Sequence, residues 1–169
     1  MNCDRDTERE LQPVPAATGP LRFQITMTSS SRLLSVVRAA ISELAAIHGF
    51  DDRQCRRITL AIDEALSNVI RHSYQNRCDR QIELICQVRS NCLEFAFLDC
   101  GEPADPARFC AQPLDETGRG GRGTHIIRQV MDEVRYDRVP EGNRLRLKKY
   151  LPGAEALRAA NESRRGEIG

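Results

Sequence analysis

Three polar side chains that could take part in chemistry recur every four residues in the segment ITLAIDEALSNVIRHSY: Glu64, Asn68 and His72. Four residues are about one turn of an α-helix, so the three side chains form a row beside its apolar stripe. The carboxylate of Glu64 can accept a proton from a hydroxyl group that attacks phosphorus. The amide oxygen of Asn68 suits a hard cation such as Mg²⁺ that phosphates also coordinate. The alternative is a row that only covers the solvent side of an amphipathic helix.

A second candidate group lies where the apolar segment LEFAFLD ends, at Asp99, Cys100, Gly101, Glu102 and Pro103. At the end of a buried strand, the oxygens of Asp99 can accept a hydrogen bond from an exocyclic amine. Gly101 would let a ligand ring approach the backbone, and Pro103 would stiffen the chain beyond it. The alternative is an aspartate that ends the strand in an Asx turn.

The third candidate is the glycine-rich segment GRGGRG at residues 118–123, which leads directly into a helical pattern. Its backbone N–H groups and the positive end of the helix would form a cradle for phosphates, and Arg119 and Arg122 would add charge there. The spacing also matches the dinucleotide motif G-x-G-x-x-G. That motif is excluded because a proline-rich loop, not a strand, precedes the glycines. A flexible linker is the remaining alternative.

Periodicity predicts the elements that must hold these segments. Strands are expected at residues 21–27, 81–89, 92–99, 133–138 and 143–151, and helices at residues 29–47, 51–74 and 123–131. Because two helices precede a hairpin instead of alternating with strands, the predicted fold class is α+β, a two-layer sandwich. The sheet is expected to be mixed and mostly antiparallel, with helices on one face.

Local signals fix the ends of these elements and the connection between them. Ser29, Ser30 and Ser31 are expected to cap the first helix, and Asp51 or Asp52 the second. Residues 100–121 show no sustained periodicity and contain several prolines and glycines, so a lid over a ligand is predicted there.

Length and composition place these elements in one domain. The 169 residues, of which 40% are hydrophobic, predict a core at residues 21–152, a flexible arm at 1–20 and a polar tail at 153–169. The net charge of +1 argues against direct nucleic-acid binding. Apolar runs are too short for a membrane span and no secretory signal is seen, so a cytoplasmic location is expected. Seven cysteines without a C-x-x-C pair predict reduced thiols.

The order of these motifs resembles the GHKL ATP-binding fold of gyrase, Hsp90, histidine kinases and MutL, a Bergerat-type fold. The segments DEALSNVIRHSY, LDCGEP and GRGGRGTHIIRQVMDEVRYDR, followed by GNRLRLKKYL, resemble the bacterial anti-sigma factor serine/threonine kinases. The resemblance covers residues 21–151. It implies a kinase that uses ATP and Mg²⁺ and phosphorylates a STAS-type anti-anti-sigma protein. It also implies sigma-factor binding and regulation of transcription by partner switching, and it allows the chain to form a homodimer.

The resemblance also implies residue roles. Glu64 would be the general base, Asn68 would hold Mg²⁺, and Asp99 would bind the adenine amino group with Gly101 beneath the ring. His72 and Tyr74 match the pattern as packing residues. Gly121 and Gly123, with the first turn of the following helix, would receive the phosphates. The residues expected to bind the nucleotide or its metal are thus Asn68, Asp99, Gly101, Gly121 and Gly123 from the resemblance, and Arg119, Arg122 and Thr124 from the glycine-rich segment of this chain itself.

Two alternatives to a protein kinase remain open from the sequence. Where the family commonly has leucine after each glycine of G-L-G-L, this chain has Arg122 and Thr124. This departure favours a partner-switch module that binds ATP without transferring phosphate. A detached histidine-kinase ATPase domain fits less well, because His48 is the only upstream histidine and no dimerisation hairpin surrounds it.

Overall fold

The computed structural model describes residues 21–103 and 122–154. The arm at 1–20, residues 104–121 of the predicted lid, and residues 155–169 of the tail lie outside the described residues. In chain order the elements are β1 (Leu21–Thr28), the 3₁₀ turn η1 (Ser31–Leu33), α1 (Leu34–Ile47), α2 (Asp52–Asn68), the π-helical turn η2 (Val69–Ser73), β2 (Gln81–Val88), β3 (Cys92–Asp99), α3 (Arg122–Val130), β4 (Glu133–Val139) and β5 (Gly142–Tyr150).

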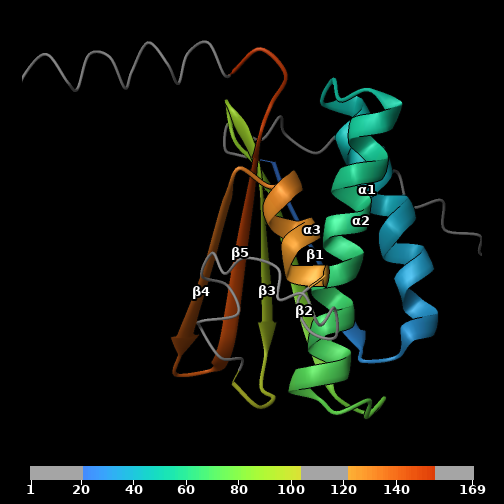
Figure 1. Ribbon diagram of the computed structural model, residues 1–169, viewed down its shortest axis with the longest axis vertical. Coiled ribbons are helices and arrows are strands. Elements are labelled where there is room, and N and C mark those ends of the chain that lie inside the picture. Colours follow the sequence, from blue (N-terminus) through green and yellow to red (C-terminus); the bar gives the residue numbers. More distant parts are fainter. Residues whose placement is uncertain (1–20, 104–121, 155–169) are drawn as a thin grey trace, which may run out of the picture.

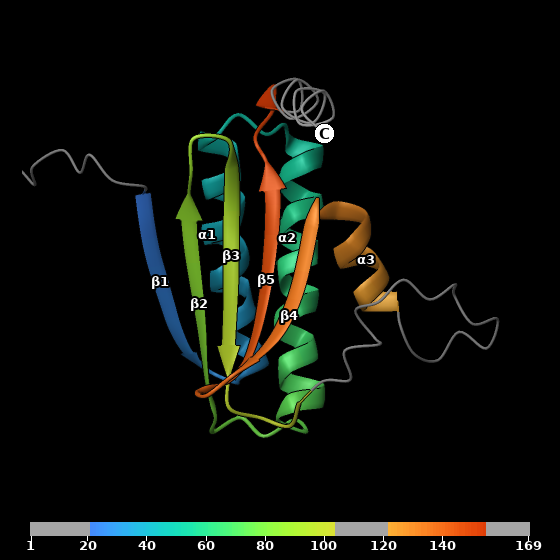
Figure 2. The ribbon, with the colours of Figure 1, turned by 90° about the vertical axis from the view of Figure 1, so that its left-hand side faces the viewer.

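The strands form one sheet in the order β1-β2-β3-β5-β4, and each neighbouring pair is antiparallel. All three described helices lie on the same face of the sheet, as Figures 1 and 2 show. The predicted two-layer α+β class is therefore confirmed. The last strand in the sequence, β5, lies between β3 and β4, so it runs directly beside the strand that ends in Asp99.

The core lies between the sheet and the helices. Phe95 and Phe97 on β3 and the stripe formed by Ile58, Ile62 and Ala65 on α2 are each exposed by 1% or less. Each of the larger side chains contributes about 1.5–3 kcal/mol by leaving water. These side chains belong to one core cluster, which holds α2 against the sheet and so positions the first two candidate groups relative to each other.

Helix α2 begins at a capping box, which decides between the two predicted caps. Oδ1 of Asp51 accepts a hydrogen bond from the backbone N–H of Gln54 at 2.7 Å, and Oε1 of Gln54 accepts one from the N–H of Asp51 at 3.0 Å. Asp51 is the cap, and Asp52 is the first helical residue. A cap of this kind contributes about 1 kcal/mol.

The predicted serine cap of α1 is wrong. Neither Ser30 nor any other serine side chain caps η1 or α1. Ser29 is buried, where its hydroxyl donates to the carbonyl of Arg77 at 2.5 Å and accepts from the N–H of Arg80 at 3.2 Å. The local sequence pattern assigned this side chain to the helix, but it makes long-range hydrogen bonds instead. A buried hydroxyl group must be hydrogen-bonded, and these partners satisfy it.

The second helix also ends differently from its prediction as one α-helix to residue 74. It is α-helical to Asn68 and continues as the π-turn η2, in which the N–H of Tyr74 bonds the carbonyl of Val69 at 3.0 Å. Gln75 and Asn76 follow with positive φ angles of 51° and 63°. Such wide turns are rare and occur often at functional sites.

The five described cysteines are free thiols, as predicted; Cys55, Cys86 and Cys92 are buried, whereas Cys78 and Cys100 are exposed. Burial raises the pKa of Cys86 to about 12, so this thiol stays protonated and packs as an apolar group. In the part of the chain that is described, no helix has the length and apolar character needed to cross a membrane.

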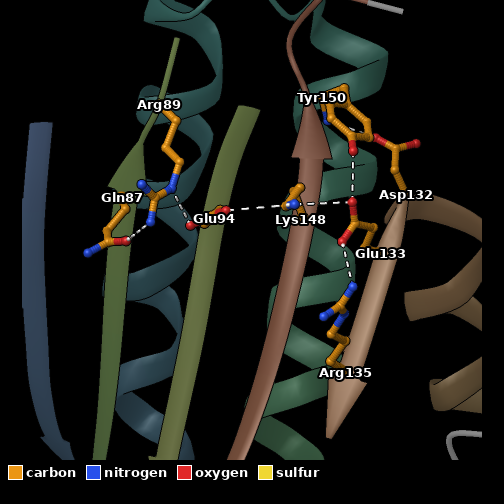
Figure 3. Close-up of polar contacts among 8 residues, drawn as sticks. All are labelled: Gln87, Arg89, Glu94, Asp132, Glu133, Arg135, Lys148 and Tyr150. Carbon is orange, nitrogen blue, oxygen red and sulfur yellow. Dashed lines mark hydrogen bonds and ion pairs between the residues drawn. The ribbon is translucent and has the colours of Figure 1, made fainter. Parts of the chain in front are cut away.

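The sheet face opposite the helices carries a charged network (Figure 3). Arg89 pairs with Glu94 at 2.6 Å, and Lys148 lies 3.8 Å from Glu94 and 3.1 Å from Glu133. The hydroxyl of Tyr150 donates to Glu133 at 2.7 Å. Partly exposed pairs contribute about 0–1 kcal/mol each, so this network adds little to the stability of the fold. Its charged groups make this face of the sheet polar.

Glu133 is expected to make folding stability depend on pH. The hydrogen bond from Tyr150, and then the one from Lys148, hold the pKa of Glu133 below its usual range. A carboxyl group with a lowered folded-state pKa stabilises the fold above its unfolded-state pKa, and the contribution is lost as the pH falls through the folded-state value. Urea unfolding should therefore show a steeper loss of stability on acidification for wild type than for Glu133→Gln. Parallel curves would refute this assignment.

Candidate active site

Asp99 lies at the end of β3 and is only 6% exposed. Its Oδ1 accepts hydrogen bonds from the N–H of Gly101 and from Nδ2 of Asn143, both at 2.9 Å. Burial raises the pKa of Asp99, while hydrogen bonds from Asn143, Gly101 and Ser73 oppose the rise. Because two donors hold Oδ1, the carboxylate has a fixed orientation, as recognition of a ligand amine requires.

Asn143 is a site residue that the sequence interpretation missed. It lies opposite Asp99 in the β3–β5 register, is 1% exposed, and its Nδ2 also approaches the carbonyls of Gly101 and Glu102 at 3.2 Å. Its Oδ1 accepts from the hydroxyl of Tyr136 at 2.9 Å. The available signal was its position in the apolar register of the strand NRLRLKKYL, where a buried amide needs partners.

Gly101 lies against the π-turn that ends the second helix. A Cβ atom at Gly101 would overlap the backbone carbonyl and the side chain of Ser73. The N–H of Glu102 donates to that same carbonyl at 2.9 Å. The prediction that Gly101 makes room for a ligand ring stays a prediction, but close packing against Ser73 already requires a glycine here.

Gly101→Ala is expected to destabilise the fold, because the new methyl group meets backbone that other hydrogen bonds hold in place. Overpacking of this kind costs about 1–3 kcal/mol, which lowers the melting temperature of a domain of this size by roughly 3–10 °C. Calorimetry without nucleotide measures the change. An unchanged melting temperature would show that η2 can move away from β3.

Tyr74, the residue after η2, bonds the start of β2 and the loop after β3. Its hydroxyl donates to the carbonyl of Gln81 at 2.6 Å and accepts from the N–H of Cys100 at 2.9 Å. The side chain is buried, and burial raises the pKa of its phenol. Tyr74 is thus placed as a packing residue that ties the end of the second helix to the loop after Asp99.

Glu64 and Asn68 lie one turn apart near the end of α2. The Glu64 side chain is 22% exposed, and its Oε1 is 3.0 Å from Nη2 of Arg71. Asn68 is the last residue of α2 and is half-buried. Figure 2 shows that the carboxyl ends of α2 and β3 lie at the same end of the molecule. The hydrogen bond from Glu102 to Ser73 joins these two ends directly.

The glycine-rich segment is only partly described. Arg119 and Gly121 lie outside the described residues, whereas Arg122 and Gly123 form the first turn of α3, followed by the half-buried Thr124. The guanidinium of Arg57 on α2 donates to the carbonyl of Gln129 on α3 at 3.4 Å. The predicted helix after the glycines is confirmed, and it packs beside α2.

Comparison with known proteins identifies this architecture. Residues 27–149 match the family described as Histidine kinase-like ATPase domain. The chain belongs to this family. The match includes Glu64, Asn68, Asp99 and Gly101, so the predicted GHKL relationship is confirmed. A family of ATPase domains implies ATP binding.

Relatives within this ATPase family narrow the comparison. The anti-sigma F factor of Bacillus subtilis (strain 168) is 30% identical over 105 residues, which cover 59% of this chain and 72% of the relative. The serine-protein kinase RsbW of the same organism is 22% identical over 139 residues, covering 78% of this chain and 86% of the relative. The chain is therefore similar to both anti-sigma factors and serine-protein kinases of the ATPase family.

A solved structure supports the same fold. A crystal structure of the RsbU and RsbW domains of a Mycobacterium tuberculosis protein has a TM-score of 0.55 and 20% sequence identity. The alignment covers 78% of this chain and 32% of the solved one. This chain thus spans about a third of the larger protein, and the likeness concerns the fold.

The donor set of this ATPase-family domain fits Mg²⁺ only together with phosphates. Among the described residues, no group of three or more His, Cys, Asp or Glu side chains could hold a metal ion. Asn68 offers a neutral carbonyl oxygen, and Mg²⁺ often takes only one or two protein ligands beside water and substrate phosphates. The residues present therefore suit a metal that arrives with ATP.

Proposed function

We propose that this chain is a cytoplasmic anti-sigma factor with ATP-dependent serine/threonine protein kinase activity, whose kinase domain is residues 21–152. Its substrate is a STAS-type anti-anti-sigma protein, and it regulates transcription by exchanging that protein with a sigma factor, itself acting as a homodimer. The observation that carries the proposal is the buried, oriented carboxylate of Asp99 beside the helix end with Glu64 and Asn68, in a domain of this family. The names of its relatives support the choice of reaction.

The nucleotide-binding step follows from the groups around Asp99. The oriented carboxylate of Asp99 accepts a hydrogen bond from the adenine amino group, with Gly101 beneath the ring. Gly121 and Gly123, with the first turn of α3, bind the phosphates through N–H groups. Arg119, Arg122 and Thr124 add a positive charge or a hydroxyl donor to that cradle. Asn68 would hold Mg²⁺, which would neutralise part of the phosphate charge.

Phosphoryl transfer then requires a base for the acceptor hydroxyl. Glu64 takes the proton of the serine or threonine hydroxyl while the oxygen of that hydroxyl forms a bond to the γ-phosphorus. The bond from that phosphorus to the ADP oxygen breaks, so the products are ADP and a phosphorylated partner. The 22% exposure of the Glu64 side chain leaves it accessible to a hydroxyl from another protein.

The test is transfer of label from [γ-³²P]ATP to a panel of unphosphorylated STAS-domain proteins encoded in the same genome. We expect at least one panel member to be phosphorylated on serine or threonine, as located by mass spectrometry. The same panel member should compete with a sigma factor for this chain in a pull-down. Label in no panel member would refute kinase activity.

A second function is favoured by Arg122 and Thr124, which stand where the family commonly has leucine. In that case the chain binds ATP as a structural ligand and switches partners without transferring phosphate. ATP would raise the melting temperature, yet no panel member would gain label. The two functions therefore differ in one measurement on the same proteins.

A further inference from the structure

The guanidinium group of Arg71 contacts the side chain of Glu64 across two turns of helix. Its Nη2 lies 3.0 Å from Oε1 of Glu64, and its Nε donates to the backbone carbonyl of Ser67 at 3.2 Å. Two contacts in different directions, one of them to backbone, hold the planar guanidinium in place on the outer side of the helix. The carboxylate of Glu64 is thereby held as well.

The position of Arg71 depends on the π-turn η2. Arg71 is seven residues from Glu64, and the chain changes from α-helix to the wider π-turn between them, at Val69. The wider turn rotates later residues around the helix axis relative to an unbroken α-helix. The π-turn thus determines both where Arg71 lies relative to Glu64 and where Ser73 meets Gly101.

We propose that Arg71 is a positioning residue for Glu64: it restricts the carboxylate to one orientation for the incoming hydroxyl. The inference rests on the proposed kinase function. A free glutamate side chain samples many rotamers and loses this conformational entropy when it is ordered. Because Arg71 already orders Glu64, the entropy is lost before the acceptor binds. Because the Arg71 side chain is 50% exposed, solvent weakens its charge effect on the carboxylate, so orientation is its main influence.

A second ion pair, which joins α1 to the residue beside Glu64 on α2, provides a matched control. Arg38 on α1 pairs with Asp63 at 2.8 Å, and the two side chains are 48% and 22% exposed, against 50% and 22% for Arg71 and Glu64. Breaking the Arg38 pair removes a similar interaction from the residue next to Glu64 without touching Glu64 itself. A purely structural role of Arg71 predicts that both changes act alike.

The experiment measures kcat and KM for phosphoryl transfer to the STAS-domain protein of the panel that accepts label. Arg71→Met, which keeps the aliphatic stem, should lower kcat about tenfold and leave KM for ATP unchanged. The kcat of Arg71→Lys should lie between those of wild type and Arg71→Met, because an ammonium group cannot hold both Glu64 and the carbonyl of Ser67. Arg38→Met should keep the wild-type kcat, and circular dichroism confirms folding of each variant.

A double-mutant cycle decides whether Arg71 acts through Glu64. In the Glu64→Gln background, Arg71→Met should change kcat less than twofold, since there is no base left to orient. An equal tenfold loss in that background, or an unchanged kcat in the single variant, overturns the inference while the kinase function stands. If the wild-type chain labels no panel member, the proposed function and this inference both fail.

Discussion

Asp99→Asn is expected to remove most of the stabilisation of this domain by ATP. Oδ1 at this position is held by two donors, from Gly101 and Asn143, so the asparagine must keep its oxygen there and turn its NH₂ group toward the ligand. A donor then faces the adenine amino group, and a hydrogen bond to a charged acceptor, worth about 1.5–3 kcal/mol, is lost. This loss lowers the affinity for ATP about 10- to 150-fold.

A thermal shift measures this loss. At a free ATP concentration about 100 times Kd, wild type gains about 2.7 kcal/mol, or roughly 8 °C. At the same concentration the variant should gain only about 0.3–1.4 kcal/mol, or roughly 1–4 °C, relative to its own melting temperature without ligand. GTP is the control, because guanine presents an acceptor where adenine has its amino group. If ATP raises the melting temperature of the variant as much as that of wild type, Asp99 does not recognise adenine.

Glu64→Ala is expected to lower kcat for phosphoryl transfer by about 10²–10⁴ while leaving ATP binding intact. The variant removes the proton acceptor near the end of α2 but none of the groups around Asp99. Since the side chain is partly exposed, the fold should lose little stability.

Single-turnover transfer to the accepting STAS-domain protein, followed by autoradiography, measures this rate. Asp63→Asn is the matched control, because it neutralises the adjacent carboxylate, which pairs with Arg38 instead. The control should transfer phosphate at the wild-type rate at saturating acceptor. A wild-type rate for Glu64→Ala would exclude Glu64 as the base and favour proton release to water.

Local signals were enough to predict the elements and the fold class. The apolar alternation of β3 and the stripe on α2 each depend on neighbours within a few residues in sequence, and both appear as expected. The aspartate at the strand end could be predicted for the same reason. Its burial follows directly from the apolar segment that carries it.

Contacts between distant segments could not be predicted in this way. Asn143 meets Asp99 from 44 positions away, through a register that exists only once β5 lies beside β3. Ser29 has a side chain suited to a helix cap, yet its hydroxyl donates a hydrogen bond to the carbonyl of Arg77 instead. One local contact was also not predicted: Arg71 pairs with Glu64 from seven residues away, across a π-turn at Val69 that no proline or glycine marks.

The insertion of β5 between β3 and β4 has a consequence for the order of events during synthesis. Asp99 leaves the ribosome more than 40 residues before Asn143, and until β5 pairs with β3 its carboxylate lacks that donor. A nascent chain that stops before β5 has most of the proposed ligand-binding residues but not the oriented carboxylate. The oriented carboxylate of Asp99 therefore exists only in a chain that already includes β5.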